Sequence, residues 1–157
     1  MASDWYITVD LPEMTYHFPA HVAVTGKRPD LVLWSDSLKT IVLMELTVPA
    51  ERGVQNAHAR KTASYGAPGG LADACRDRGW SVYLMPVEVG VLGFVADSMR
   101  VALKKLGVWS RELHTLLSET ALRCSYLIFL QHKNQAWTSW RMFQKPQHIQ
   151  GVEHCLR

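Results

Sequence analysis

Two carboxylates interrupt apolar stretches of the sequence. Asp30 opens the apolar segment 30–34, and Glu45 lies inside the apolar segment 40–48. An acid within an apolar strand is costly unless it is paired, hydrogen-bonded or bound to a metal. Residues 35–39 have the composition of a turn, so the two segments are expected to form a hairpin with one acid on each strand. The pair suggests a site for a divalent metal.

The oxygen atoms around Glu45 suit such a metal. Side chains alternate along a strand, so Glu45 and Thr47 share one face, with the carbonyl of Leu46 between them. We therefore expect Asp30, Glu45 and the Leu46 backbone carbonyl to bind Mg²⁺ or Mn²⁺, which prefer hard oxygen ligands. A metal held there would polarise a phosphate and lower the pKa of a bound water.

Each of these acids also has a simpler explanation. Asp30 follows a proline at the start of a strand, where it can cap a turn. Glu45 can form a buried ion pair with Arg28 or Arg60. Glu88 lies near the end of the next apolar strand, where ligand sites of parallel sheets gather, and is either a third metal ligand or a structural partner for a basic side chain.

The order of these residues resembles the core of the PD-(D/E)xK restriction-like endonucleases over about residues 28–90. That family has Pro-Asp, a hairpin of apolar strands, a Glu followed two residues later by a Lys, and then a helix. The resemblance implies an α/β fold with a central mixed β-sheet flanked by helices, in which Asp30 and Glu45 bind the metal. The family's Lys positions or activates the attacking water, and this chain carries Thr47 in its place. The positive charge must then come from another part of the chain.

A helix expected over 51–65 offers that charge. Lys61 and Tyr65 are four residues apart, so both lie on one helix face. The pair resembles the Gln-x-x-x-Tyr element of the exonuclease branch of the superfamily, some members of which carry the catalytic lysine on this helix. We expect Lys61 to replace the motif lysine, with Lys27 and Arg28 as alternatives, and Tyr65 to orient a phosphate or a water. A solvated helix face for Lys61 and a core position for Tyr65 are the structural alternatives.

Further motifs recur in order along the chain: Thr15-Tyr16-x-Phe18-Pro19, Arg28-Pro29-Asp30-Leu31-Val32, Glu45-Leu46-Thr47-Val48-Pro49, Ala57-His58-x-Arg60-Lys61-x3-Tyr65, Gly79-Trp80 and Pro86-Val87-Glu88-Val89-Gly90-x2-Gly93-Phe94. Over about residues 11–130 they resemble a domain of predicted reverse-transcriptase and transposon-derived proteins of animal genomes. Glu-Leu-Thr is the usual form of the motif in that group. This chain departs from it at Ala50, where Trp is usual, and at 67–70, where the helix usually continues. The resemblance implies the endonuclease of a mobile element, or a host protein derived from one.

The charge of the chain is unevenly distributed around a net value of +3. Residues 1–99 carry 8 Lys/Arg against 11 Asp/Glu, whereas residues 100–157 carry 9 against 3. An acidic part that binds metal beside a basic part suits an enzyme acting on DNA, or alternatively on RNA, although a solvated basic helix face explains the charge more simply.

Other features of the sequence bear on the cellular location of the protein. The apolar runs are too short to span a membrane. The first residues lack the basic and apolar regions of a signal peptide, and the three cysteines contain no CxxC pair. We expect a nuclear or cytoplasmic protein that is not secreted and has no membrane partner.

The resemblance implies a restriction-endonuclease-like domain over 1–132, with a helical C-terminal cover, followed by a basic, Trp-containing tail over 133–157. The strand over 80–89 is expected to run parallel to that over 40–48 and to be covered on both faces, because a helical crossover joins them. Further strands are expected over 5–10 and 21–25, and further helices over 71–78, 94–106 and 110–131.

The sequence thus predicts a metal-dependent nuclease that cleaves DNA phosphodiester bonds. The alternative is a catalytically inactive nucleic-acid-binding or interaction module on the same fold, and a homodimer is compatible with either. The candidate catalytic residues are Asp30, Glu45, Thr47, Lys61 and Tyr65.

Overall fold

The computed structural model describes residues 4–13 and 16–133. The chain divides into two compact units, Met1–Leu122 and Arg123–Arg157. Apart from Lys133, the expected tail lies outside the described residues.

A four-stranded mixed sheet with the order β1-β2-β3-β4 forms the centre of the first unit. β1 (Trp5–Val9), β2 (Leu31–Ser35) and β3 (Thr40–Thr47) are antiparallel neighbours, and β4 (Ser81–Glu88) runs parallel to β3. The expected hairpin and the expected parallel crossover are both confirmed. The chain is therefore an α/β protein with a mixed sheet flanked by helices.

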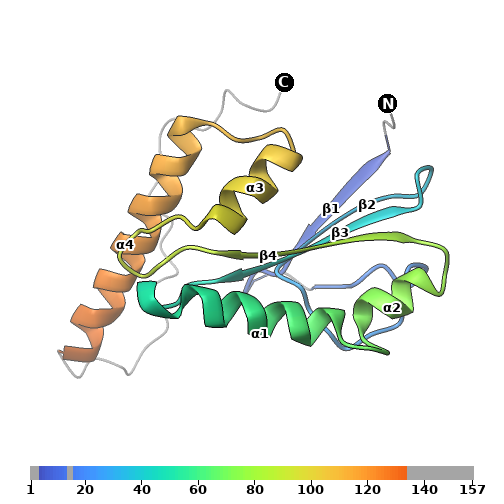
Figure 1. Cartoon of the computed structure of the whole chain (residues 1–157), viewed down its shortest axis with the longest axis horizontal. Coiled ribbons are helices and arrows are strands. Elements are labelled where there is room, and N and C mark those ends of the chain that lie inside the picture. The colour runs from blue at the N-terminus through green and yellow to red at the C-terminus, as the bar shows by residue number, and fades with distance from the viewer. Residues whose placement is uncertain (1–3, 14–15, 134–157) are drawn as a thin grey trace. The chain divides into compact units, whose positions relative to one another are not determined.

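The helices lie on the two faces of this sheet (Figure 1). A short 3₁₀ turn, η1 (Glu51–Gly53), leads into α1 (Val54–Gly66), and α1 and α2 (Leu71–Arg76) cover one face. α3 (Asp97–Lys105) covers the other face, together with the first turns of α4 (Arg111–Lys133). None of the helices in the described part of the chain is long and apolar enough to cross a membrane.

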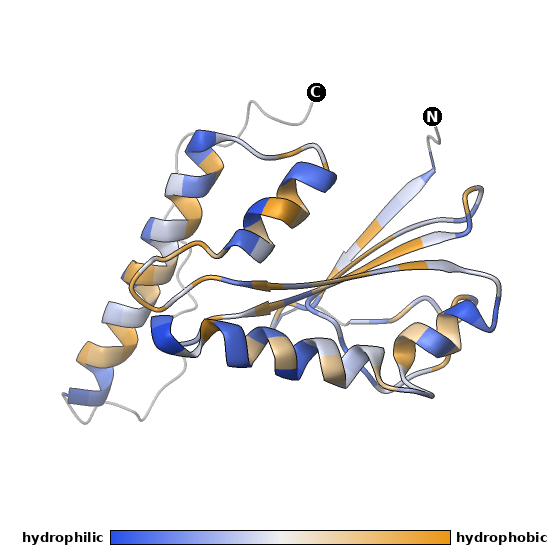
Figure 2. Ribbon diagram, viewed as in Figure 1, coloured by the Kyte–Doolittle hydropathy of each residue, from blue (hydrophilic) through white to orange (hydrophobic). Residues whose placement is uncertain are grey.

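Two apolar clusters hold the sheet between its helices. On the α1 face, Ile41 and Leu43 of β3 pack with Tyr65 and Trp80, and on the α3 face Met44 and Val87 pack with Met99. The hydrophobic residues of the strands are the orange segments at the centre of Figure 2, whereas much of α1 is hydrophilic. Successive side chains of β3 point to opposite faces of the sheet, so Ile41 and Leu43 face α1. Glu45 and Thr47, which follow at the same two-residue spacing, face the same side.

Three expectations are wrong in detail. Residues 21–25 form no strand, because the segment turns after Pro19 and packs Val22 into the α1-side cluster as irregular chain. β4 is the edge strand, and only its second half is covered on both faces: Val87 packs on the α3 side and Glu88 is buried beside α1, whereas Tyr83 in the first half is 53% exposed. The helix expected from residue 94 begins at Asp97, because Val95 forms an isolated bridge with Val89.

A side chain caps the start of α4. The Ser110 hydroxyl accepts a hydrogen bond from the Leu113 amide at 3.1 Å. A side-chain oxygen bonded in this way satisfies one of the free amides at a helix N-terminus, so Ser110 is the N-cap of α4.

Candidate metal centre

Asp30 and Glu45 meet at the point where β2 begins. The antiparallel register pairs Leu31 with Met44, so its continuation places Asp30 opposite Glu45. The Asp30 carboxylate accepts a hydrogen bond from the Leu46 amide at 2.7 Å. In an extended strand the N–H and C=O of one residue point to the same side, so the Leu46 carbonyl also faces the Asp30 side of β3. The three oxygen donors that the sequence predicts are thus brought to one corner of the sheet.

Glu45 is buried and reaches one cation. Only 6% of the residue is exposed, and its Oε1 forms an ion pair with the Lys61 ammonium group, which α1 brings over the sheet. Glu45 therefore forms a buried ion pair, as one of the sequence alternatives proposed, but its partner is Lys61 rather than Arg28 or Arg60. Arg28 pairs with Asp10 at 2.5 Å, and Arg60 is exposed.

Two polar atoms beside this ion pair have no partner. Glu45 Oε2 and Thr47 Oγ1 are buried and accept no hydrogen bond of normal length and angle from any described residue, although the Tyr65 hydroxyl lies close enough to the Glu45 carboxylate to interact with it. Leaving such atoms unpaired away from water costs about 1–3 kcal/mol each. A cation or an ordered water against them would remove that cost. The donor set of Asp30, Glu45 and the Leu46 carbonyl therefore fits a hard divalent metal.

The acidities of the neighbouring groups reflect the same crowding. Burial raises the pKa of Asp30, and the charge of Glu45 adds to it, while the Leu46 amide and Lys61 act in the opposite direction. Burial and the adjacent Glu45 carboxylate also raise the pKa of Tyr65 well above its usual range. The Tyr65 phenol therefore stays protonated at neutral pH and can donate a hydrogen bond.

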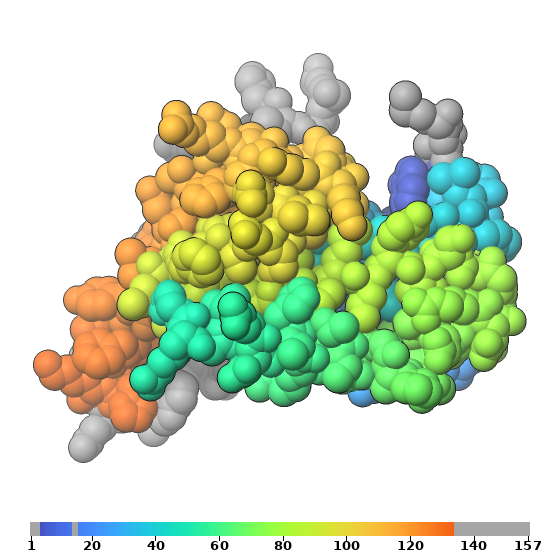
Figure 3. Space-filling view, viewed as in Figure 1, coloured from blue at the N-terminus to red at the C-terminus, as the bar shows by residue number. Residues whose placement is uncertain are grey.

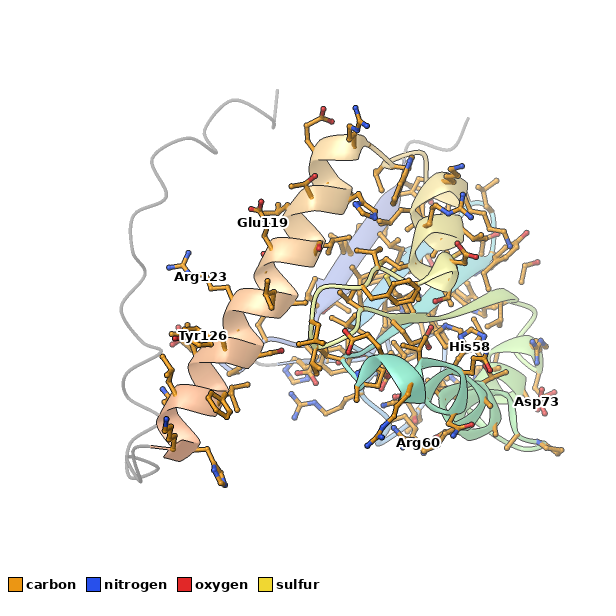
Figure 4. All side chains as sticks on the ribbon, turned by 60° about the vertical axis from the view of Figure 1, so that its left-hand side comes forward. His58, Arg60, Asp73, Glu119, Arg123 and Tyr126 are labelled. Atoms are coloured by element: carbon orange, nitrogen blue, oxygen red, sulfur yellow. The ribbon has the colours of Figure 1, made fainter. Side chains whose placement is uncertain are left out.

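α1 presents its polar residues to the sheet at helical spacing. His58, Lys61 and Tyr65 occupy one side of the helix, with Ala57 buried beside them. Arg60 projects from another side of α1 (Figure 4). This helical spacing places Lys61 over the sheet, where its ammonium group reaches Glu45.

The segment before β2 lines a pocket that contains two basic residues. The pocket has a volume of about 300 Å³, and its lining includes Tyr16, Lys27 and Arg28. The Arg28 guanidinium lies 5.4 Å from the centre of the Tyr16 ring, and the Lys27 ammonium lies 5.8 Å from that of Tyr65. Lys27 and Arg28 thus line this pocket, while Lys61 is the cation in contact with Glu45.

Glu88 belongs to a separate cluster. It is 1% exposed, and its carboxylate receives hydrogen bonds from Ser98 and from His58 Nδ1, the latter at 3.1 and 3.2 Å. No group of three or more His, Cys, Asp or Glu residues within 4–13 and 16–133 is arranged to hold a metal. Of its two expected roles, Glu88 therefore takes the structural one, as a partner for a basic side chain. It does not form a third ligand beside Asp30 and Glu45.

His58 is not among the site residues predicted from the sequence. The available signal was its position three residues before Lys61 and seven before Tyr65, which places all three on one helix face. In the space-filling view, α1 and α3 lie on opposite sides of the segment that contains β4 (Figure 3).

Comparison of the chain with models of protein families gives no match, and comparison with curated proteins gives none either.

Proposed function

We propose that this chain is a metal-dependent nuclease that cleaves DNA phosphodiester bonds on a restriction-endonuclease-like fold, with RNA as the alternative substrate. The observation that carries the proposal is the convergence of Asp30 and Glu45 beside a buried, unpartnered carboxylate oxygen and a lysine delivered by α1. The sequence resemblance further suggests the endonuclease of a mobile element, or a host protein derived from one, acting in the nucleus or cytoplasm.

Asp30, Glu45 and the Leu46 carbonyl would hold Mg²⁺ or Mn²⁺. The metal, when bound, polarises the scissile phosphate and acidifies a water. Lys61 supplies the positive charge that Thr47 lacks, and it stabilises negative charge developing on the phosphate. The Tyr65 phenol donates a hydrogen bond to a phosphate oxygen or to the attacking water.

The first test is cleavage of supercoiled plasmid and of single-stranded DNA in Mn²⁺. The wild-type chain is expected to nick or degrade these substrates, and Asp30→Asn and Glu45→Gln to lose that activity while still binding DNA. Asp73→Asn is the matched control, because Asp73 forms an exposed pair with Arg76 on α2. Equal cleavage by all four proteins would reveal a contaminating nuclease, and no cleavage by the wild type would refute the proposal.

A second test exchanges the position of the lysine. Lys61→Met is expected to lose cleavage by at least about a hundredfold, as expected for removing a positioned charge from a transition state. Thr47→Lys combined with Lys61→Met restores the usual family motif and is expected to recover part of the rate. Failure of the double variant to exceed Lys61→Met, with folding intact, would show that Lys61 does not substitute for the motif lysine.

The inactive module remains a second candidate, because Lys61 already neutralises Glu45 without a metal. A self-sufficient ion pair of this kind stabilises a fold that no longer needs its cofactor. This candidate predicts salt-dependent DNA binding that a chelator leaves unchanged, and no cleavage in Mn²⁺.

A further inference from the structure

Glu88 and His58 form a second charged pair on the same side of the sheet as the metal centre. Glu88 is paired with Thr47 in the parallel register, and Thr47 shares its face with Glu45. Diagonal neighbours on a sheet face lie about 7–8 Å apart. His58 lies one helical turn before Lys61 on α1. The two pairs are therefore adjacent, each joining a buried carboxylate of the sheet to a cationic side chain of α1.

The two members of this second pair differ sharply in exposure. The side chain of Glu88 is 1% exposed, whereas that of His58 is 45% exposed. Ser98 and His58 hold the carboxylate from two different helices, α3 and α1. A carboxylate bonded to Nδ1 fixes the orientation of an imidazole ring and leaves Nε2 free for another partner. Glu88 is thus a rigid support, and His58 is the group that it presents.

We infer that His58 is a phosphate-binding residue, oriented by Glu88, for a nucleic-acid phosphate next to the one at the metal centre. This inference rests on the proposed nucleic-acid substrate. With Nδ1 bonded to Glu88, the protonated ring donates Nε2–H to an anionic oxygen, and such charge-assisted bonds are short and strong. His58 is a positioning residue, because it acts on the bound strand beside the reacting phosphate.

The salt dependence of binding measures this contact without any chemistry. A fluorescent single-stranded oligonucleotide is titrated with the whole chain in EDTA at several salt concentrations. Each phosphate contact contributes about 0.7 to the slope of log K against log salt for single strands. His58→Gln, which cannot carry a positive charge, is expected to lower the slope by about that amount at pH 5.5. His58→Arg, which keeps a positive charge at this position, is expected to keep the wild-type slope at the same pH.

His21→Gln is the matched control. His21 is 51% exposed and pairs with Asp36 at 3.0 Å, so it is a carboxylate-paired histidine of similar exposure, but it contacts Trp34 and Trp80 rather than α1. Its slope is expected to equal that of the wild type. Circular dichroism of each variant establishes that it folds, and His58→Arg keeps the test decisive if the Gln variant does not.

The outcomes separate the two proposals. A lower slope for folded His58→Gln supports the inference even if the wild type cleaves nothing, which would refute the nuclease alone. Equal slopes for the wild type and His58→Gln, or no oligonucleotide binding by the wild type, would overturn the inference, whether or not the wild type cleaves DNA.

Discussion

The ion pair between Lys61 and Glu45 gives the sharpest prediction about the site. Lys61→Met removes the cation and leaves Glu45, which is 6% exposed, as a buried carboxylate without compensation. Breaking a fully buried pair from one side costs about 3–5 kcal/mol. The Lys61 side chain is 28% exposed, so water screens part of the charge and a loss of about 1–3 kcal/mol is expected. Glu45→Gln removes the charge instead, so it is expected to cost less.

The assay is urea unfolding followed by circular dichroism at pH 7 in EDTA, because a neutral denaturant does not screen ion pairs. The wild type, both single variants and Lys61→Met/Glu45→Gln form a double-mutant cycle. The double variant is expected to be more stable than Lys61→Met alone, with a coupling energy of at least about 1 kcal/mol. The Arg76–Asp73 pair, which is exposed on both sides, is the matched control and is expected to couple by less than about 0.5 kcal/mol.

A divalent metal distinguishes a binding site from a purely structural pair. Mn²⁺ against Glu45 replaces the missing lysine charge, so Mn²⁺ is expected to recover more stability in Lys61→Met than in the wild type. A coupling energy near zero would show that Lys61 does not contact Glu45, and the catalytic role assigned to Lys61 would then have no structural basis. Coupling without a response to Mn²⁺ would favour the inactive module.

Three further predictions follow from individual contacts. Folding raises the pKa of Asp30, so the wild type loses stability as the pH rises from the unfolded pKa of 3.8 through the higher folded pKa. In EDTA, Asp30→Asn is therefore expected to be more stable than the wild type at pH 7 but not at pH 3. Equal urea midpoints of the two proteins at pH 7 would contradict this. Gly93 has φ +90°, and a Cβ added there would lie 2.8 Å from the Ser118 carbonyl oxygen. Gly93→Ala is therefore expected to lower the free energy of unfolding in urea by at least about 2 kcal/mol. Gly26→Ala, with open space around it, is the control and is expected to change stability by less than about 0.5 kcal/mol. Tyr65→Phe removes a buried phenol that stays protonated, so cleavage is expected to fall by roughly tenfold to a hundredfold while the fold survives; an unchanged kcat would leave Tyr65 only its place in the core.

Local pattern was sufficient to predict the elements that carry the metal centre. The apolar runs on either side of a polar turn determine the hairpin, and strand alternation then determines that Glu45 and Thr47 face the same way as Ile41 and Leu43. The juxtaposition of Asp30 with Glu45 follows from the register alone. These relations involve neighbours along a strand or across one turn, so a single sequence contains them.

Relations between distant segments were not predictable in the same way. The apolar run of β4 indicates burial, but it does not show that β4 lies at the edge of the sheet, because sheet order depends on all of the strands. The alternating residues 21–25 pack against the α1-side cluster without forming backbone pairs of a strand. The partners of Glu88 come from α1 and α3, and no local spacing links residues 58, 88 and 98.

The charges of the candidate metal centre suggest why its lysine belongs on α1. Asp30, Glu45 and Lys61 together carry one net negative charge, while Glu88 has a partner of its own in His58. A divalent metal held there would turn the first group to one net positive charge, and one phosphate would then make it neutral. Metal and phosphate should therefore strengthen each other's binding, since each removes the charge that opposes the other. A lysine at position 47 would stand beside Glu88 in the register, where it would compete with His58 for that carboxylate. Thr47 avoids this competition, and α1 then delivers each cation to its own carboxylate.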